Sequence, residues 1–368
     1  MNNNKEVFWN IFKNKKVIVT GHTGFKGSWL SIWLYSLGAK VYGISKSIPT
    51  IPSNFNACKL ENKLTEDYRA DVCNLENTKK IINKIKPDFI FHLAAQSLVR
   101  ASYEDPFSTW QTNTLGTVSV LESLKSISNE CISIFITSDK CYENLEWEWG
   151  YREIDRIGGI DPYSASKGGA ELAINSYSKC FFNEGGVKVG IGRAGNVIGG
   201  GDWSPFRLVP DCMKSWSKNK RVVIRNPDST RPWQHVLEPL SGYLLLASKL
   251  YLNQKLRGEA FNFGPPANQN YNVMSVVKEM SNYWDKVKWE TNRDKNFVES
   301  GLLKLNCDKA LSKISWEPVW NFNETIYHTV NWYKNFYVKK DDNFQFALNQ
   351  ITDYTNSAIS KGLSWTND

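Results

Sequence analysis

The chain has 368 residues, of which 41% are hydrophobic and 22% are charged. These values exclude a largely disordered protein, and the length favours two lobes over one compact core. The formal net charge is +8, but the Lys and Arg residues are spread along the chain without forming a stripe, so nucleic acid is not an expected partner.

Two short β-branched runs, at residues 16–20 and 40–44, predict buried strands near the N-terminus. Between them, a glycine-rich turn opens an apolar segment that ends at Gly38 and predicts a helix. Three further helices and three further strands follow in alternation. The helices are expected at residues 77–85, 107–127 and 163–182, and the strands at residues 89–93, 131–137 and 187–192. This alternation is typical of an α/β fold of the Rossmann type, a doubly wound parallel sheet.

The regular alternation fades beyond residue 190. Residues 199–201 and 205–232 predict loops, and the last 30 residues are polar and poorly patterned. The remaining expected elements are strands at residues 231–236 and 261–263 and helices at residues 238–252, 273–284 and 323–336. We therefore expect a Rossmann domain at residues 1–192, with returning segments near 232–264, and a smaller α+β lobe formed mainly by residues 193–368.

The seven Cys residues are scattered and lack a C-x-x-C pair, and the four His residues are equally dispersed. This usage predicts neither a disulfide framework nor a metal site, and it fits the reducing cytoplasm. Residues 1–6 are polar, and no run of about 18 apolar residues occurs. Neither a signal peptide nor a membrane span is therefore expected, and the sequence predicts a cytoplasmic protein.

The segment from Gly21 to Gly27 reads G-H-T-G-F-K-G and connects the first strand to the first helix. Glycine lets the backbone turn tightly and approach a pyrophosphate, while the helix N-terminus offers free N–H groups to the phosphates. A strand before and a helix after are the context that a dinucleotide-binding loop requires. The residues predicted to hold such a cofactor are Gly21, Thr23, Gly24, Phe25, Lys26 and Gly27.

The residues after the second strand leave NAD and NADP both open. Ile44 is followed by Ser45, Lys46 and Ser47, so no acid is present to bind a ribose 2′-hydroxyl, and Lys46 could meet a 2′-phosphate. Asp71, which precedes Val72, is a candidate contact for the adenine edge. An N-cap or a solvated loop acid explains Asp71 equally well.

Tyr163 and Lys167 lie four residues apart in a predicted helix and therefore share one face. A nearby ammonium favours a phenolate, so we expect a lowered pKa for Tyr163, which suits a base that deprotonates a hydroxyl while hydride leaves the same carbon. The alternative is an ordinary surface pair.

The run Thr137-Ser138-Asp139-Lys140 ends the predicted strand at 131–137, and ligands of open parallel sheets bind beyond such strand ends. A hydroxyl, an acid and an amine in a row can stabilise an oxyanion, donate a proton and accept one. The alternative is a polar turn.

Together these motifs resemble the extended short-chain dehydrogenase/reductase family of nucleotide-sugar epimerases and dehydratases. The resemblance rests on the glycine loop, Ala94-Ala95-Gln96 after the 89–93 strand, Ser138 and the Tyr163/Lys167 pair, and it covers nearly the whole chain. Longer strings are similar to those members that dehydrate CDP-glucose. They are VTGHTGFKGSWLSIWL from Val19, TSDKCYEN from Thr137, RAGNVIGGGDW from Arg193, RPWQHVLEPLSGYL from Arg231 and GLLKLNCDKA from Gly301.

The resemblance implies NAD as the cofactor and a CDP-linked hexose as the substrate. Further cofactor contacts implied by it are Asp71, Val72, Ala94 and Ala95, and the implied substrate contacts are Gln96, Asn196, Arg207 and Arg231. Arg231 suits the diphosphate, because a guanidinium binds phosphate oxygens in pairs. The helices at 107–127 and 163–182 are those that such enzymes commonly use to form a homodimer or homotetramer.

The resemblance also implies a mechanism of oxidation, elimination and reduction. Ser138 would bind the C4 hydroxyl of the sugar, Tyr163 would deprotonate it, and Lys167 would tune Tyr163 and hold the nicotinamide ribose. Asp139 would protonate the departing C6 hydroxyl, and Lys140, kept neutral by burial and neighbouring positive charge, would take the C5 proton. The product would be a 4-keto-6-deoxy sugar, a precursor of lipopolysaccharide deoxysugars.

Three alternatives stay open at this point. A nucleotide-sugar 4-epimerase or 4-reductase would keep Tyr163 and Lys167 but would not need an acid/base pair, so Asp139-Lys140 favours a dehydratase. A dehydratase of another nucleotide hexose is the second, because no residue identifies the base. A non-catalytic NAD-binding regulator is the third, although it would tolerate the loss of Tyr163 or Lys167 and both are present.

Overall fold

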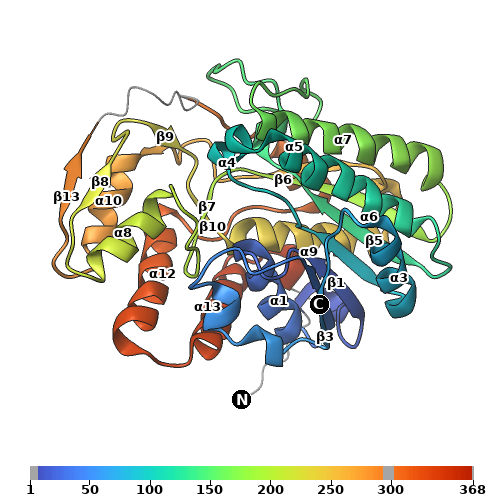
Figure 1. Ribbon diagram of the computed structural model, residues 1–368, viewed down its shortest axis with the longest axis horizontal. Coiled ribbons are helices and arrows are strands. Elements are labelled where there is room, and N and C mark those ends of the chain that lie inside the picture. Colours follow the sequence, from blue (N-terminus) through green and yellow to red (C-terminus); the bar gives the residue numbers. More distant parts are fainter. Residues whose placement is uncertain (1–6, 293–301, 367–368) are drawn as a thin grey trace.

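The computed structural model describes residues 7–292 and 302–366, so residues 1–6 and Gly301, on which the sequence analysis also drew, lie outside it. A seven-stranded sheet of parallel strands forms the centre (Figure 1). The strands are β1 (Lys16–Thr20), β2 (Lys40–Ser45), β3 (Glu66–Arg69), β4 (Phe89–His92), β5 (Cys131–Ile136), β6 (Val187–Ala194) and β11 (Ala260–Phe263). Their order is β11-β6-β5-β4-β1-β2-β3, so the chain winds outward from β1 in both directions. The predicted doubly wound parallel sheet is confirmed.

The first strand–helix–strand unit follows from its local sequence. The apolar residues of β1 are fully buried, and Lys16 pairs with Lys40 at the start of β2. Helix α1 (Phe25–Ser36) is apolar around most of its circumference, because it is covered by other helices on the side away from the sheet. Gly38, with φ of +76°, ends it as predicted, since that conformation favours glycine.

Helices cover both faces of the sheet, and each face has its own hydrophobic cluster (Figure 1). On one face pack α3 (Leu75–Ile85), α6 (Gly116–Leu124) and α7 (Pro162–Phe181), with Ile82, Val120 and Ile174 in the cluster. On the other pack α1, α9 (Leu237–Leu252) and α13 (Asn343–Ser360), with Trp29 and Leu244 in the cluster. Both faces are therefore sealed, as a parallel sheet requires.

The predicted helix at 107–127 is interrupted by a π-helical turn. It consists of α5 (Pro106–Trp110), the turn Gln111–Leu115 and α6. Within the turn, buried Asn113 donates to the Ser166 hydroxyl at 2.9 Å and so joins the turn to α7. Such single turns often occur beside functional sites, and α7 carries Tyr163.

Several elements were not predicted, among them β3, α4 (Val99–Glu104) and α8 (Leu208–Trp216). The prediction of loops throughout residues 205–232 is therefore wrong. Pro210 suggested a loop, but it lies in the first turn of α8, where an amide hydrogen would have no helical partner.

Beyond β6 the chain forms a smaller group of short elements, at the left of Figure 1. Two-stranded sheets pair β7 (Val197–Ile198) with β10 (Gln234–His235), β9 (Thr230–Arg231) with β12 (Tyr271–Asn272), and β8 (Val222–Ile224) with β13 (Trp289–Thr291). The helices are α10 (Val273–Ser281), α11 (Asp308–Ile314) and α12 (Phe322–Lys334), and a one-turn α2 (Asn54–Ala57) precedes β3. Pro232 separates β9 from β10, so the one strand expected at 231–236 is two.

Residues 339–366 are ordered, which corrects the expectation of a poorly patterned tail. They contain α13, which packs against α1. Its buried positions Phe344, Ala347, Ile351 and Tyr354 recur at intervals of three and four, the period of a helix face. Polar residues between them hid this pattern. Within the described part of the chain, no helix is long and apolar enough to cross a membrane.

Candidate active site

The loop between β1 and α1 carries glycines because its backbone is too crowded for side chains. Gly21 has φ of +73°, and a Cβ on Gly27 would lie 2.1 Å from the Gly21 carbonyl oxygen. Gly24 is the N-cap of α1 and offers no side-chain acceptor to the amides of Phe25 and Lys26 in the first turn. These amides and the positive end of the helix dipole suit an external anion, so the loop fits the pyrophosphate of a dinucleotide.

Thr23 and His22 fasten this loop to the neighbouring strand ends. The Thr23 hydroxyl donates to the Ser47 carbonyl at 2.7 Å. The buried His22 ring lies 2.9 Å from Ser45 Oγ and 3.0 Å from Asp67 Oδ1, and burial lowers its pKa. Sequence reasoning gave His22 no role, because its partner on β3 is 45 residues away.

Lys46 and Asp71 form an ion pair beyond the carboxyl ends of β2 and β3, with Lys46 Nζ 3.0 Å from Asp71 Oδ2. Asp71 also accepts the N–H of Cys73 at 2.9 Å. Lys46, which could meet a 2′-phosphate, therefore has an acidic partner within the protein. Val72, which follows Asp71, is buried.

The residues predicted to carry the chemistry come from the end of β5 and the start of α7. Ser138 and Asp139 lie just beyond the end of β5, after Thr137, and both are buried. Ser138 donates to Asp139 Oδ1 at 3.0 Å, and its oxygen accepts the N–H of Lys140 at 3.2 Å. The strand end therefore presents the serine hydroxyl and the acid as one hydrogen-bonded unit.

Tyr163 and Lys167 occupy the first turns of α7, whose N-cap Asp161 accepts the N–H of Ser164 at 2.9 Å. Ser138 acts on the Tyr163 side chain and lowers its pKa. Lys167 Nζ donates to the carbonyl of Ile136, the last residue of β5, at 3.4 Å. The fold thus brings the two motifs into one cluster of candidate catalytic residues, which we call the catalytic cluster: Ser138, Asp139, Lys140, Tyr163 and Lys167.

Burial opposes charge on the titratable groups of this cluster. It raises the pKa of Tyr163 to about 12 and lowers the pKa of Lys167 to about 8. The expectation of a lowered pKa for Tyr163 is therefore wrong, because the burial that penalises the phenolate also weakens the charge of the nearby lysine. Burial likewise raises the pKa of Asp139, which suits a carboxylic acid that must hold a proton before donating it.

Lys26 extends from the first turn of α1 into the same region. Its Nζ lies 5.9 Å from the ring centroid of buried Tyr243, and charge interactions link it to Asp139, Arg207 and Lys167. Burial lowers the pKa of Lys26 to about 7. Sequence reasoning placed Lys26 among the cofactor contacts only, since nothing local shows that it faces a strand end 113 residues away.

Of the four predicted substrate contacts, the structure brings Arg207 to the catalytic cluster. Arg207 Nη1 lies 2.8 Å from Asp202 Oδ2, and its charge acts on Tyr163. Asn196 lies in the short link between β6 and β7. The other two are held elsewhere: Gln96 bonds to Leu98 within its own loop, and Arg231, on β9, donates to the Thr230 carbonyl at 2.7 Å.

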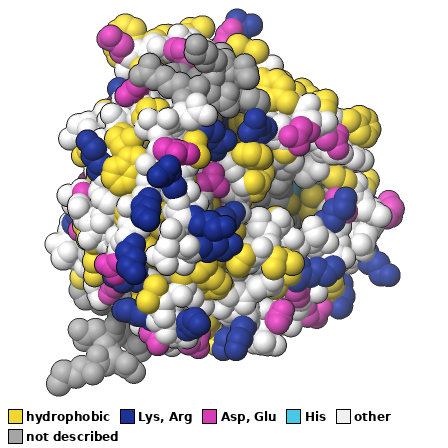
Figure 2. Space-filling model, turned by 60° about the vertical axis from the view of Figure 1, so that its left-hand side comes forward, with side chains coloured by type: hydrophobic (Ala, Val, Ile, Leu, Met, Phe, Trp, Pro, Cys, Tyr) yellow, Lys and Arg dark blue, Asp and Glu magenta, His cyan; other side chains and the backbone are white. Residues whose placement is uncertain are grey.

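Two arginines that the sequence did not indicate converge on an exposed ring. Arg100 of α4 and Arg225, which follows β8, lie 4.5 Å and 5.6 Å from the ring centroid of Phe206. Phe206 is next to Arg207 in the chain. On the face shown in Figure 2, which brings the smaller lobe forward, Lys and Arg side chains gather beside a hollow. This grouping suits an anionic ligand.

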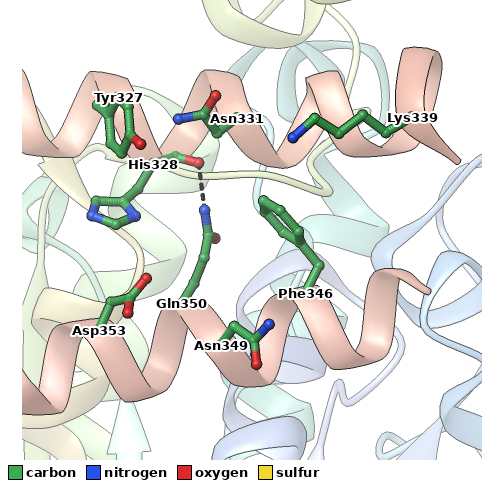
Figure 3. Close-up of a pocket in the computed structure, with 8 residues that line it drawn as sticks. All are labelled: Tyr327, His328, Asn331, Lys339, Phe346, Asn349, Gln350 and Asp353. Atoms are coloured by element: carbon green, nitrogen blue, oxygen red, sulfur yellow. Dashed lines mark hydrogen bonds between the residues drawn. The ribbon is translucent and has the colours of Figure 1, made fainter. Parts of the chain in front are cut away.

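A separate crevice of about 290 Å³ lies between α12 and α13 (Figure 3). Gln350 of α13 points across it and donates to the His328 carbonyl of α12 at 2.6 Å. The His328 ring stacks on Trp320 at a centroid distance of 3.8 Å. None of the predicted site residues lines this crevice. Among the described residues, no group of three or more His, Cys, Asp or Glu side chains is arranged to hold a metal.

The sequence is similar to known proteins over most of its length. The family model described as GDP-mannose 4,6 dehydratase matches residues 18–329. A CDP-glucose 4,6-dehydratase of Salmonella typhimurium is 45% identical over 351 residues, covering 94% of this chain and 97% of that one.

Solved structures at lower identity show the same fold. A dTDP-glucose 4,6-dehydratase from Bacillus anthracis in complex with NAD has a TM-score of 0.72 at 22% identity, covering 87% of this chain and 97% of that one. A UDP-glucuronic acid 4-epimerase from Bacillus cereus, in complex with UDP-glucuronic acid and NAD, has a TM-score of 0.73 at 21% identity, covering 87% and 99%.

Proposed function

The chain belongs to the GDP-mannose 4,6 dehydratase family, and from that premise we propose that it converts CDP-glucose to CDP-4-keto-6-deoxyglucose and water. The observation that carries the reaction type is the buried acid Asp139, hydrogen-bonded to Ser138 within the same cluster as Tyr163. A 4-epimerase needs no acid there, whereas loss of the C6 hydroxyl does. The choice of CDP-glucose is supported by the 45% identity with the Salmonella enzyme.

NAD is the proposed cofactor, and the glycine loop fits its pyrophosphate. The residues that would hold it are the loop residues, Asp71, Val72, Ala94, Ala95 and Lys167. When bound, oxidised NAD supplies a hydride acceptor and a positive charge. The preference for NAD over NADP is supported by the pairing of Lys46 with Asp71, which gives that lysine a partner other than a 2′-phosphate.

The first chemical step is deprotonation of the C4 hydroxyl. Ser138 forms a hydrogen bond with that hydroxyl, and Tyr163 takes the hydroxyl proton as the C4 hydride departs. Burial raises the pKa of Tyr163 to about 12, so the phenolate depends on positive charge brought into the site. Arg207 contributes to this charge, because it lowers the pKa of Tyr163.

The second step is elimination across C5 and C6. The C4 ketone acidifies the C5 proton, which Lys140 removes, while Asp139 donates its proton to the departing C6 hydroxyl. Burial keeps water away from Asp139, and its raised pKa favours the protonated form needed for donation. Reduction at C6 and return of a proton to C5 then complete the 4-keto-6-deoxy sugar.

The nucleotide sugar is proposed to lie between the catalytic cluster and the smaller lobe. Arg207 and Arg231 would bind the diphosphate, with Asn196 and Gln96 as further contacts. In this assignment residues 1–192, with returning segments near 232–264, hold NAD, and residues 193–368 mainly hold the substrate. We further propose that the protein is a cytoplasmic hydro-lyase and forms a homodimer or homotetramer through the helices at 107–127 and 163–182.

The experiment that tests this function is mass spectrometry of the purified protein incubated with CDP-, dTDP-, GDP- and UDP-hexoses, with and without NAD. Loss of one water from CDP-glucose alone is the expected result. Dehydration of another nucleotide sugar would keep the chemistry and overturn the choice of CDP. Appearance of a 4-epimer without a mass change would replace the dehydratase by an epimerase.

A further inference from the structure

The crevice between α12 and α13 lies apart from the catalytic cluster, and its lining combines amide side chains with aromatic rings (Figure 3). Its volume of about 290 Å³ is large enough for one sugar ring. The amides belong to Asn331, Asn349 and Gln350, and two of the rings belong to Tyr327 and Phe346. A few polar groups placed among aromatic rings are typical of sites that bind small molecules.

One buried polar atom of this crevice lacks a partner. Gln350 is 3% exposed, and its amide reaches across the crevice to α12, where Nε2 donates to the His328 carbonyl at 2.6 Å. This bond fixes the orientation of the amide, because only the nitrogen can donate to a carbonyl. Oε1 is the atom that remains, and among the described residues it accepts no hydrogen bond. A buried acceptor without a donor is costly, so this oxygen requires an O–H or N–H group from outside the chain.

The charges around the crevice favour an uncharged ligand. Lys339 and Asp353 are the charged side chains of its lining, one of each sign, and they lie toward opposite ends of it (Figure 3). His328 is neutral near pH 7, because burial lowers its pKa to about 4. A phosphate group would meet a single lysine here and none of the arginines that bind phosphate oxygens in pairs. An organic cation would meet a single carboxylate.

A sugar ring satisfies these groups together. Each hydroxyl both donates and accepts, so neighbouring hydroxyls can donate to Gln350 Oε1 and Asp353 and accept from the amide of Asn331. The C–H groups on one face of a pyranose form an apolar surface that can cover the ring of Phe346. We propose that this crevice binds an uncharged monosaccharide, a pyranose that donates a hydroxyl to Gln350 Oε1. The site is distinct from the one proposed for the nucleotide sugar and does not depend on the dehydratase function.

Trp320 gives this site a spectroscopic signal. The His328 ring lines the crevice and stacks on the buried Trp320 ring, with a centroid distance of 3.8 Å and an angle of 3° between the planes. A ligand that contacts His328 should therefore change the fluorescence of Trp320. Trp320→Phe identifies which part of the signal comes from this residue.

The experiment is a titration of the full-length protein with D-glucose, followed by tryptophan fluorescence and by saturation-transfer NMR. We expect saturable binding with a dissociation constant on the order of 1 mM, as suits a ligand of this size. Gln350→Met and Asp353→Ala should each weaken binding about 10-fold. Asp353 is exposed, so its variant keeps the test valid if Gln350→Met fails to fold. Asp341→Ala is the matched control, because it removes an exposed acid outside the crevice and should leave binding unchanged.

CMP and choline, titrated in the same way, serve as the anionic and the cationic probe. If either of them binds and is weakened by the crevice variants while D-glucose is not bound, the proposed class of ligand is wrong. If D-glucose binds wild type and all variants equally, it binds elsewhere on the protein. If no probe gives saturable binding, water alone meets Gln350 Oε1. Each of these three results would overturn the monosaccharide site.

Discussion

Arg193 and Glu171 form a two-pronged ion pair inside the protein, with Arg193 Nε 2.9 Å from Glu171 Oε1 and Nη2 3.0 Å from Oε2. Glu171 lies one turn beyond Lys167 on α7, and Arg193 lies on β6. Thr137, at the end of β5, donates to Glu171 Oε1 at 2.5 Å. The pair therefore fastens the helix that carries Tyr163 to the two strands beside the catalytic cluster.

Replacing Glu171 by Gln should lower the free energy of unfolding by about 3–5 kcal/mol, because it leaves the charge of Arg193 buried without a counter-charge. Chemical denaturation measures the loss. Glu290→Gln is the matched control, since it removes the partner of Arg221 in an exposed pair and should change stability by about 0.5 kcal/mol or less. Equal losses in the two variants would contradict a structural role for the buried pair.

The fold was predictable from the sequence wherever a pattern is local. The glycines after β1 and the apolar runs of β1 and β2 identify the first unit, because neighbouring residues create those constraints. β3 was missed because its sequence, EDYR, is polar and lies at the edge of the sheet, so it lacks the apolar run of an interior strand.

The site was predictable only in part for the same reason. Tyr163 and Lys167 are one helical turn apart, and Ser138 and Asp139 are adjacent, so their spacing alone indicated shared chemistry. The approach of Lys26 to Asp139 joins α1 to the end of β5, and only the folded chain creates it. The pKa of Tyr163 was predicted in the wrong direction, because a sequence pattern shows a nearby lysine but not the burial that opposes it.

Replacing Tyr163 by Phe should slow C4 oxidation about 100-fold or more, because the hydroxyl proton then has no base. Formation of reduced cofactor in a single turnover measures the effect, with thermal unfolding as the check on the fold. A base acts when it is deprotonated, so the wild-type rate should fall as pH falls below the pKa of Tyr163 in the loaded enzyme. Burial raises this pKa to about 12, and the positive charge of bound NAD should lower it. Ultraviolet titration of the wild type and of Tyr163→Phe, with and without NAD, measures this change. A near-normal rate would remove Tyr163 from the mechanism.

Replacing Asp139 by Asn should impair elimination and stabilise the fold. Reduced cofactor should persist, because C4 oxidation continues while the C6 hydroxyl has no acid. Burial raises the pKa of Asp139 above its unfolded value of about 3.9, so its contribution to stability is complete below pH of about 3.9 and is lost as pH rises through the folded pKa. Denaturation at several pH values should therefore show that the free energy of unfolding of Asp139→Asn, relative to that of the wild type, increases as pH rises. If this difference in stability did not vary with pH, burial would not be raising the pKa of Asp139 in the folded protein.

Replacing Lys26 by Met should shift the pH dependence of elimination. The charge of Lys26 lowers the pKa of Asp139, so its removal should raise that pKa. Elimination needs protonated Asp139, and its rate falls as pH rises through this pKa, so the falling limb should move to higher pH in Lys26→Met. Lys26→Arg keeps the charge and should leave the limb near its wild-type position. An unmoved limb in Lys26→Met would mean that its charge does not reach Asp139.

Replacing Lys140 by Met tests which lysine removes the C5 proton, since two lysines act on Asp139 by charge, Lys140 from the strand end and Lys26 from α1. Turnover in deuterium oxide should place deuterium at C5 of the wild-type product, because a lysine exchanges its protons with solvent before returning one. Lys140→Met should slow both turnover and C5 exchange about 100-fold or more, as measured by mass spectrometry. Lys26→Met is the matched control and should keep C5 exchange, because it removes a charge without removing the base. The reverse result, with exchange lost in Lys26→Met and kept in Lys140→Met, would assign the C5 base to Lys26, whose pKa of about 7 already allows a neutral amine.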